Sequence, residues 1–171
     1  ANINILGGTV NNVYGGNVLT IQTQQNADTT RQNANIVIGK TDEKTTPKVN
    51  GKIFGSGKFD RVGKAKIQLI KCATTPTVYG GSDGSGITNE TEIYLKGMTT
   101  NTIYGGSDTD GIVTTSKIYL QTGTTTDVYG GGYGGTTTTS NVTFDGSSTV
   151  ESIFGGSNTN GTVGTSNIQL K

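Results

Sequence analysis

A short motif recurs along this chain at a fixed spacing, and that spacing restricts the fold more than any other feature. The motif is an aliphatic residue, an aromatic ring and two small residues, and its copies begin at Val13, Ile53, Val78, Ile103, Val128 and Ile153. From Ile53 onward the copies are 25 residues apart, whereas the first step, from Val13 to Ile53, is 40. A period of this length indicates a solenoid, because one unit can bury its apolar face only against the next.

A second motif keeps the same period. It is a triplet of an apolar, a mostly polar and another apolar residue, and its copies begin at Ile3, Ile36, Ile67, Ile93, Ile118, Val142 and Ile168. Alternation with a period of two is typical of a short strand with one buried face. Helix signals are missing, since the chain has no 3.6-residue apolar period and few strong helix formers.

Together these patterns predict an all-β fold, a single-domain parallel β-helix (β-solenoid) that spans residues 1–171. We expect about 25 residues per coil, six to seven coils and about three short strands in each coil. Equivalent strands of neighbouring coils should lie about 4.8 Å apart, and the crossover preference of parallel strands favours a right-handed coil. Expanded loops at about 22–35 and 39–52 account for the 15 extra residues of the first step.

The composition excludes several kinds of catalytic site. The chain has no His, so Ser-His-Asp and Cys-His catalysis are excluded. Its single Cys72 can form neither an intramolecular disulfide nor a zinc site. The acidic residues are scattered over corners instead of clustering beside a basic residue, as a polysaccharide lyase on this fold would require. We therefore expect no enzyme activity, no cofactor and no metal.

The segment IYGGSDTDGIVTTSKIYLQTGTTTDVYGG, residues 103–131, resembles the YGG-type repeats of bacterial surface and adhesin-like β-helix proteins. The resemblance covers nearly the whole chain. It implies an extracellular or bacterial cell-surface location and a structural, adhesive or fibre-forming role, and it assigns no catalytic residues. The start of the chain, ANINILGG, is compatible with a mature secreted protein. No apolar run approaches the roughly 18 residues of a membrane span, so we expect no membrane insertion.

The aromatic residues of the motif are the first candidate site. They form one column of the repeat: Tyr14, Phe54, Tyr79, Tyr104, Tyr129 and Phe154. Strict alternation places each ring on the outer side of its strand, since the preceding aliphatic residue points inward. An exposed row would bind a polysaccharide or a neighbouring molecule, which makes a glycan-binding module the alternative function. A corner at the following glycines would instead fold the rings into an internal stack.

The glycine-rich corner that follows Ile103 holds two carboxylates, Asp108 and Asp110. Such a corner could hold a weakly bound Ca²⁺. The equivalent positions of the last corner are Asn158 and Asn160, however, and Asn and Asp both favour turns by bonding to their own backbone. The turn interpretation is therefore favoured over a calcium site.

The two edges of the predicted stack are the second candidate site. The first and last triplets, with Ile3, Ile5, Ile168 and Leu170, have no neighbouring coil to cover them, and solenoids normally require caps. Residues 1–75 carry a net charge of +6 (ten basic, four acidic) and residues 76–171 carry −5 (three basic, eight acidic). These features predict subunits that stack head to tail in a fibre, or else a segment of a longer solenoid. The basic half lacks a nucleic-acid motif, so we expect no nucleic-acid partner.

Overall fold

The structure, a computed structural model, describes residues 1–17, 32–42 and 44–171, and the regular elements of these residues are all strands. They are β1 (Asn2–Ile5), β2 (Thr9–Val10), β3 (Val13–Tyr14), β4 (Gln32–Ile38), β5 (Lys48–Val49), β6 (Lys52–Phe54), β7 (Arg61–Leu69), β8 (Thr77–Tyr79), β9 (Ile87–Tyr104), β10 (Ile112–Tyr129), β11 (Thr136–Phe154) and β12 (Thr162–Leu170). Nothing in this part of the chain is a helix that could cross a membrane.

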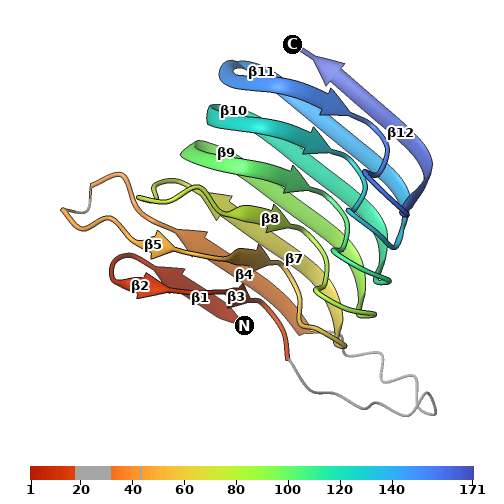
Figure 1. Ribbon diagram of the computed structural model, residues 1–171, viewed down its shortest axis with the longest axis horizontal. Helices are drawn as coiled ribbons and strands as arrows, with labels where there is room; N and C mark the ends of the chain where they lie inside the picture. Colours follow the sequence, from red (N-terminus) through yellow and green to blue (C-terminus); the bar gives the residue numbers. More distant parts are fainter. Residues whose placement is uncertain (18–31, 43) are drawn as a thin grey trace.

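The strands stack as coils along one axis and pair with their equivalents in the coils above and below (Figure 1). One side, which we call face A, is a parallel ladder in the order β1-β4-β7-β9-β10-β11-β12. The other, face B, consists of β3, β6, β8 and the C-terminal parts of β9, β10 and β11. Face A thus has seven rungs and face B six, which confirms the predicted parallel solenoid.

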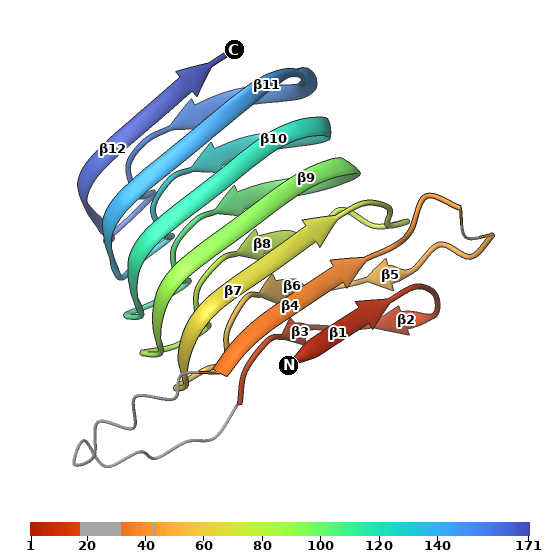
Figure 2. The same cartoon turned by 180° about the vertical axis from the view of Figure 1, so that it is seen from behind.

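The coil is right-handed, as the crossover preference favours. In Figure 1 the nearer strands run from left to right, the farther strands return from right to left, and the chain rises from the N- to the C-terminus. The reverse view in Figure 2 shows the same sense, with the strands of face A now in front.

Each regular coil has two faces instead of the three short strands that we expected. β10 continues without a break from Ile112 through the triplet to Tyr129, so the weak strand predicted before the triplet is the beginning of the same long strand. The turn from face A to face B lies at Gly97, Gly123 and Gly146, whose φ angles are 122°, 115° and 78°. Glycine is suited to these positions because side chains disfavour positive φ.

The aliphatic residues of both motifs fill the space between the two faces. The triplet residues Ile36, Ile67, Ile93 and Ile118 pair in register and have no solvent exposure. The motif residues Ile53, Val78, Ile103 and Val128 are equally buried on the opposite side. The middle residues of the triplets, such as Gln68 and Tyr119, are partly exposed on the outer surface of face A, as the alternation predicts.

The first coils depart from the predicted loop boundaries. Of the loop predicted at 22–35, residues 22–31 lie outside the described residues, and residues 32–35 belong to strand β4. Of the loop predicted at 39–52, Lys48 and Val49 form β5, which pairs with β2 in a separate two-stranded sheet, and Lys52 begins β6. The last part of the 39–52 insertion is therefore strand and not loop. It is held in the stack because the apolar Val49 side chain is buried in the core.

Candidate functional site

The aromatic residues of the motif form a continuous stack along face B. Neighbouring ring centroids lie 4.7 to 5.1 Å apart, and their planes are within 10 to 14° of parallel. The spacing follows from the ladder, because each ring is carried by a backbone position that pairs with its equivalent one coil away, for example Phe54 with Tyr79 and Tyr79 with Tyr104. Offset parallel rings at this distance attract one another.

The rings are placed outside the strands of face B, yet three of the six are buried and two more are partly buried. Phe54, Tyr79 and Tyr104 form a cluster separate from the aliphatic core, with Tyr14 and Tyr129 packed against it. Tyr79 and Tyr104 are only 4 % and 5 % exposed, whereas Phe154 is 44 % exposed. The alternation rule therefore placed the rings on the correct side of the strand, but the solvent-exposed row that a glycan-binding platform requires is absent at Tyr79 and Tyr104.

The orientation of the rings also bears on what the column can bind. A sugar stacks on the flat face of an aromatic ring. Here each inner ring has both faces covered by the rings of the coils above and below, since the stack runs along the solenoid axis. Only ring edges and hydroxyl groups point away from the axis. Among the described residues, the stack ends at Tyr14 and Phe154, which each have one ring neighbour in it.

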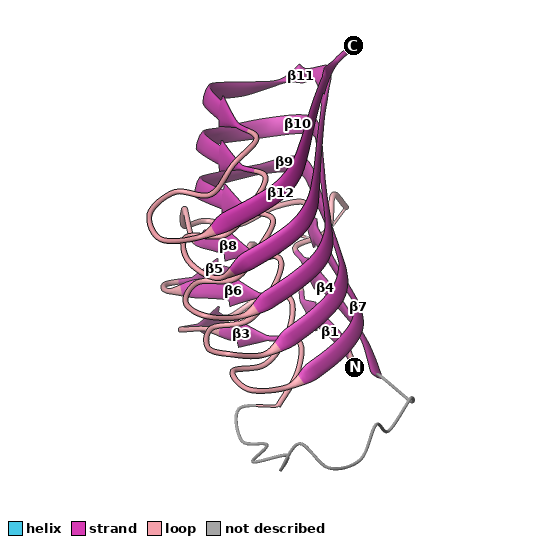
Figure 3. Ribbon diagram, turned by 90° about the vertical axis from the view of Figure 1, so that its right-hand side faces the viewer, coloured by secondary structure: helices cyan, strands magenta, loops and turns pink. Residues whose placement is uncertain are grey.

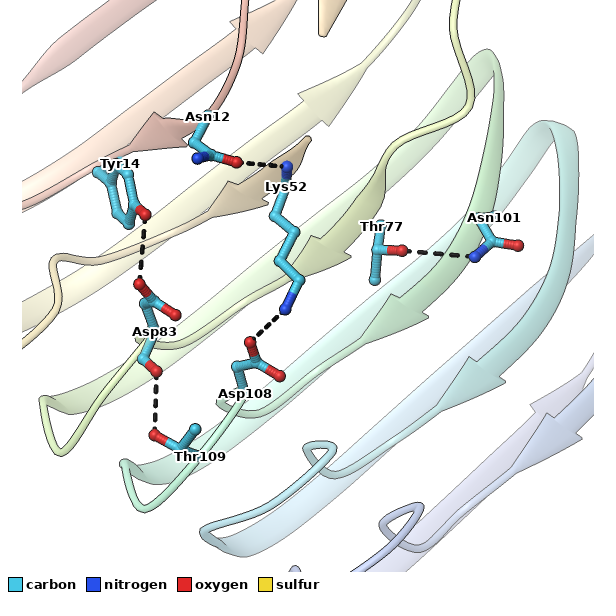
Figure 4. A network of polar contacts seen from close by, with 8 residues as sticks. All are labelled: Asn12, Tyr14, Lys52, Thr77, Asp83, Asn101, Asp108 and Thr109. Atoms are coloured by element: carbon cyan, nitrogen blue, oxygen red, sulfur yellow. Dashed lines mark hydrogen bonds and ion pairs between the residues drawn. The ribbon is translucent and has the colours of Figure 1, made fainter. Parts of the chain in front are cut away.

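The glycine-rich corners that follow the motif lie one above another along one side of the solenoid (Figure 3). Two of their side chains form hydrogen bonds with ring hydroxyls of earlier coils, and Figure 4 shows the bond between Tyr14 and Asp83. The Tyr14 hydroxyl donates to Asp83 at 3.2 Å, and the Asn158 amide donates to the Tyr104 hydroxyl at 3.0 Å. Tyr133 packs edge-on against the Tyr104 ring. These corner residues form the outer cover of the stack.

Burial and nearby carboxylates raise the pKa of stacked tyrosines, which makes their phenols weaker acids than usual. Burial is the main reason that the pKa of Tyr79 is raised well above its usual range, and the charge of Asp108 raises it further. Burial likewise raises the pKa of Tyr104, although the hydrogen bond from Asn158 lowers it in part. A phenol with a raised pKa stays protonated at neutral pH, so these groups act as neutral hydrogen-bonding groups and not as general bases.

The proposed calcium ligands do not converge in the structure. The Asp108 carboxylate is largely buried and pairs with the Lys52 ammonium group at 2.5 Å (Figure 4). The same ammonium lies 5.2 Å from the centre of the Tyr79 ring. Asp110 is exposed. Across residues 1–17, 32–42 and 44–171, no group of three or more His, Cys, Asp or Glu side chains is placed to hold a metal ion. Asp108 therefore has a structural partner inside the corner.

The corners bring successive backbones into direct contact, which explains their glycines. A Cβ atom on Gly105 would collide with the carbonyl oxygen of Gly130 in the next coil, which leaves no room for any side chain. Inside the same corner, a column of small hydroxyl residues satisfies these carbonyls: Thr91 donates to Gly105, and Ser116 donates to Gly130. This hydroxyl column was missed in the sequence, although its members are also one period apart.

A second polar cluster, on the outer surface of face A, was also missed. Lys64 pairs with Glu90 at 2.9 Å and with Glu92 at 2.7 Å, and Lys117 pairs with Glu90 at 2.6 Å. These pairs raise the pKa of Lys117 and lower the pKa of Glu90. The signal was available in the sequence, because residues one coil apart face each other: Lys64 is in register with Glu90. Part of the charge difference between the two halves is therefore neutralised within the chain.

The same surface carries a shorter aromatic stack. Tyr94 and Tyr119, middle residues of two triplets, have ring centroids 4.7 Å apart. The ammonium groups of Lys66 and Lys96 lie 5.3 and 5.2 Å from the centre of the Tyr94 ring. This pair has the same ring spacing as the long stack. In addition to the Tyr119 ring, Tyr94 has two lysine ammonium groups as neighbours.

The four predicted edge residues lie where the sequence placed them, on the first and last rungs of face A. Ile3 and Ile5 in β1 are partly buried and pack against the aliphatic core. Ile168 in β12 is 46 % exposed and Leu170 is 73 % exposed, although the equivalent residues of inner coils are buried. Among the described strands, β1 and β12 each pair with one strand only, so both edges of the ladder are open.

Comparisons with known proteins assign the chain to no family. No protein-family model matches the chain, and neither a curated protein nor a solved structure matches it. The geometry of the solenoid and its edges is therefore the basis for inferring a function.

Proposed function

We propose that this chain is a non-enzymatic structural or adhesive solenoid of the bacterial cell surface or extracellular space, and that it assembles head to tail with further copies of itself. The observation that carries the proposal is the pair of open edges in face A. Ile168 and Leu170 on β12 are the equivalents of Ile3 and Ile5 on β1, so a second copy placed with its β1 on β12 would continue the same ladder.

The free energy for such a joint would come from apolar burial and backbone pairing. Inner residues equivalent to Leu170, such as Leu95 and Leu120, lose all solvent exposure to the neighbouring coil. A heterologous contact of this kind does not close on itself, so its repetition gives a filament. The edge strand also presents backbone groups that a parallel strand can satisfy by strand addition.

Charge supports the same orientation with a smaller contribution. The exposed Lys44 and Lys48 belong to the first coils, and the exposed Asp145 and Glu151 belong to the last complete one. Opposite charges would thus meet at a head-to-tail joint. The contribution is limited, because Lys52 and Lys64 are already paired with acids of the same chain.

The alternative of a glycan-binding module is not supported by the aromatic column. Its inner rings are covered by corners and stacked on one another, so they offer no face to a sugar ring. A polysaccharide or host surface remains a candidate partner for the outer surface of the rod as a whole. That binding would be adhesive and would not depend on Tyr79 or Tyr104.

Assembly is testable by sedimentation velocity and negative-stain electron microscopy of the purified chain. We expect rods that lengthen with protein concentration and shorten with salt, since surface charges are screened. Leu170→Lys should abolish the rods by placing a charge in the joint, while Thr138→Lys, on an exposed position of β11, should leave them intact. A wild-type chain that stays monomeric at high concentration and low salt would refute the proposal.

A further inference from the structure

The outer surface of face A is open in the middle of the ladder. In Figure 2 the strands β7, β9 and β10 face the viewer, and no described element crosses over them. All three have a neighbouring strand on both sides, so this surface does not depend on where the stack begins or ends. Alternation along each strand directs outward the residues Lys64, Lys66 and Gln68 of β7, Tyr94 and Lys96 of β9, and Tyr119 of β10.

The lysines of this surface fall into two groups. The two glutamates of β9 already pair with Lys64 and Lys117. Lys66 and Lys96 form no ion pair with any carboxylate of the described residues. The Lys96 ammonium instead donates a hydrogen bond to the amide oxygen of Gln68 at 3.1 Å. Two positive charges of the surface are therefore left without an acidic partner in the described part of the chain.

Both of these ammonium groups gather at one ring. They lie 5.3 and 5.2 Å from the centre of the Tyr94 ring. Tyr119, on β10, stacks on one face of this ring. Lys66 and the hydrogen-bond partner of Lys96, Gln68, belong to β7 on the other side of β9, so both ammonium groups lie toward the opposite ring face. Two like charges held at one ring repel each other, and the ring offsets only part of this repulsion, so an anion would be attracted by both.

The occupant has to be anionic and must not require a free aromatic face. Tyr94 has Tyr119 on one face and ammonium groups toward the other, so the bases of a single-stranded nucleic acid find no platform to stack on. An acidic polysaccharide needs no such platform, because its hydroxyl groups bond to amide and hydroxyl side chains. These continue on neighbouring rungs, with Gln68 on β7 and Asn141 and Thr143 on β11. The rung spacing of about 4.8 Å is also close to the length of one sugar unit in an extended chain.

We propose that the outer surface of face A around Tyr94 binds an anionic polysaccharide, carboxylated or sulfated, that lies along the solenoid axis across β7, β9 and β10. Lys66 and Lys96 pair with its acidic groups, and the amide of Gln68 bonds to its hydroxyl groups. The glutamates keep Lys64 and Lys117 occupied, so the uncompensated charge is confined to the Tyr94 ring. The proposal names a partner for the adhesive part of the proposed function, on which it rests, and it does not require that copies assemble.

Labelled oligosaccharides of matched length test the binding. The anionic probes are fluorescein-labelled polygalacturonate and dextran sulfate, and the uncharged control is dextran. Fluorescence anisotropy with the wild-type chain should show that one or both anionic probes bind, that dextran does not, and that added salt weakens binding by screening the charges. The preferred probe tells a carboxylated partner from a sulfated one. Binding of neither anionic probe, or equal binding of dextran, would overturn the proposal.

A matched set of lysine variants locates the site. Lys66→Gln and Lys96→Gln should each weaken binding about 2- to 5-fold, the range of an exposed ion pair. Lys58→Gln is the control, because it removes the same charge from a lysine that also lies over an aromatic ring, in the corner between β6 and β7. It should leave binding unchanged. An equal loss in all three variants would show that the probe responds to net charge alone, and the proposed site would be wrong.

Lysine acetylation, followed by mass spectrometry of the digested chain, gives a readout without substitution. The bound polysaccharide should slow acetylation of Lys66 and Lys96 but not of Lys58. Oligothymidylate, a single-stranded nucleic acid, should protect them less, and equal protection by it would contradict a site for polysaccharide. Rods without polysaccharide binding would count against this proposal only, and polysaccharide binding without rods would count against the assembly proposal only.

Discussion

The solenoid contains two buried columns that differ in what covers them. The aliphatic column lies between face A and face B, so both of its sides are closed by hydrogen-bonded ladders. The aromatic stack lies on the outer side of face B and is closed by corner residues that change from coil to coil: Asp83, Asp108, Tyr133 and Asn158. The first column thus depends on strand pairing, and the second depends on the path of irregular loops.

This difference has consequences for stability and for chemistry. The aliphatic column consists of apolar side chains, so its contribution comes from the apolar area removed from water. The aromatic stack adds phenol hydroxyls, which the corner must supply with partners such as Asp83 and Asn158. Four substitutions, each with a matched control, test whether the two columns differ in this way.

Removing a ring from the middle of the aromatic stack should have the largest effect. Phe54→Ala leaves a large cavity between two neighbouring rings, and we expect a loss of about 3–5 kcal/mol in the free energy of unfolding. Phe154→Ala, at the exposed end of the stack, should cost about 1 kcal/mol, since it loses one ring contact. Urea denaturation followed by circular dichroism gives both values. Equal losses would mean that the corners do not bury the stack.

Truncation within the aliphatic column should cost slightly less. Ile118→Ala removes a fully buried side chain from face A, with an expected loss of about 2–5 kcal/mol. Ile112, six residues earlier on the same strand, is 43 % exposed, and its replacement by Ala should cost at most about 1 kcal/mol. Differential scanning calorimetry of the two variants tests the assignment of inward and outward positions. A larger loss of stability for Ile112→Ala than for Ile118→Ala would show that the inward and outward positions of the strand are exchanged.

Adding a methyl group at a corner glycine tests the contribution of corner packing to stability without changing the aromatic rings. Gly105→Ala brings a Cβ atom against the Gly130 carbonyl, and overpacking of this kind costs about 1–3 kcal/mol. Gly156→Ala meets open space and should be close to neutral. The comparison requires only thermal melts of the two proteins. A destabilised Gly156→Ala variant would contradict the open space above this corner.

The smallest effect concerns the ring hydroxyls and depends on pH. Because the folded pKa of Tyr79 is raised above the unfolded value near 10, its stabilising contribution is complete below about pH 10 and is lost as the pH rises through the folded value. Tyr79→Phe should therefore reduce the loss of stability in alkali, at a cost of about 1 kcal/mol at neutral pH for the missing hydroxyl interaction. Absorbance at 295 nm follows phenolate formation, and Tyr133→Phe, at an exposed ring, is the control.

The sequence predicted the ladder well because the ladder depends on period alone. Positions 25 residues apart pair in register, so the repeat by itself assigns Ile93 and Ile118 to one buried column. The open rungs at Ile168 and Leu170 follow from the same count.

The cover of the aromatic stack could not be predicted in this way. Alternation places Tyr79 outside its strand, but it does not say that a corner from another coil will fold over that side. The partners of Tyr14 and Tyr104 are 69 and 54 residues away, two coils further on, and belong to loops whose path the period does not determine. The division of each coil into two faces was missed for a related reason, since glycines such as Gly123 turn the chain without ending the strand.

The direction of the backbone hydrogen bonds has a mechanical consequence. Strand pairing runs along the axis of the rod, from coil to coil, so a load applied to the two ends pulls against one ladder rung at a time. From Ile53 onward, each rupture would release a coil of 25 residues, which extends to roughly 80–90 Å at about 3.3–3.6 Å per residue. This regular part of the rod would yield in equal steps under tension, and each step would lengthen the molecule by many times the height of the coil that it lost.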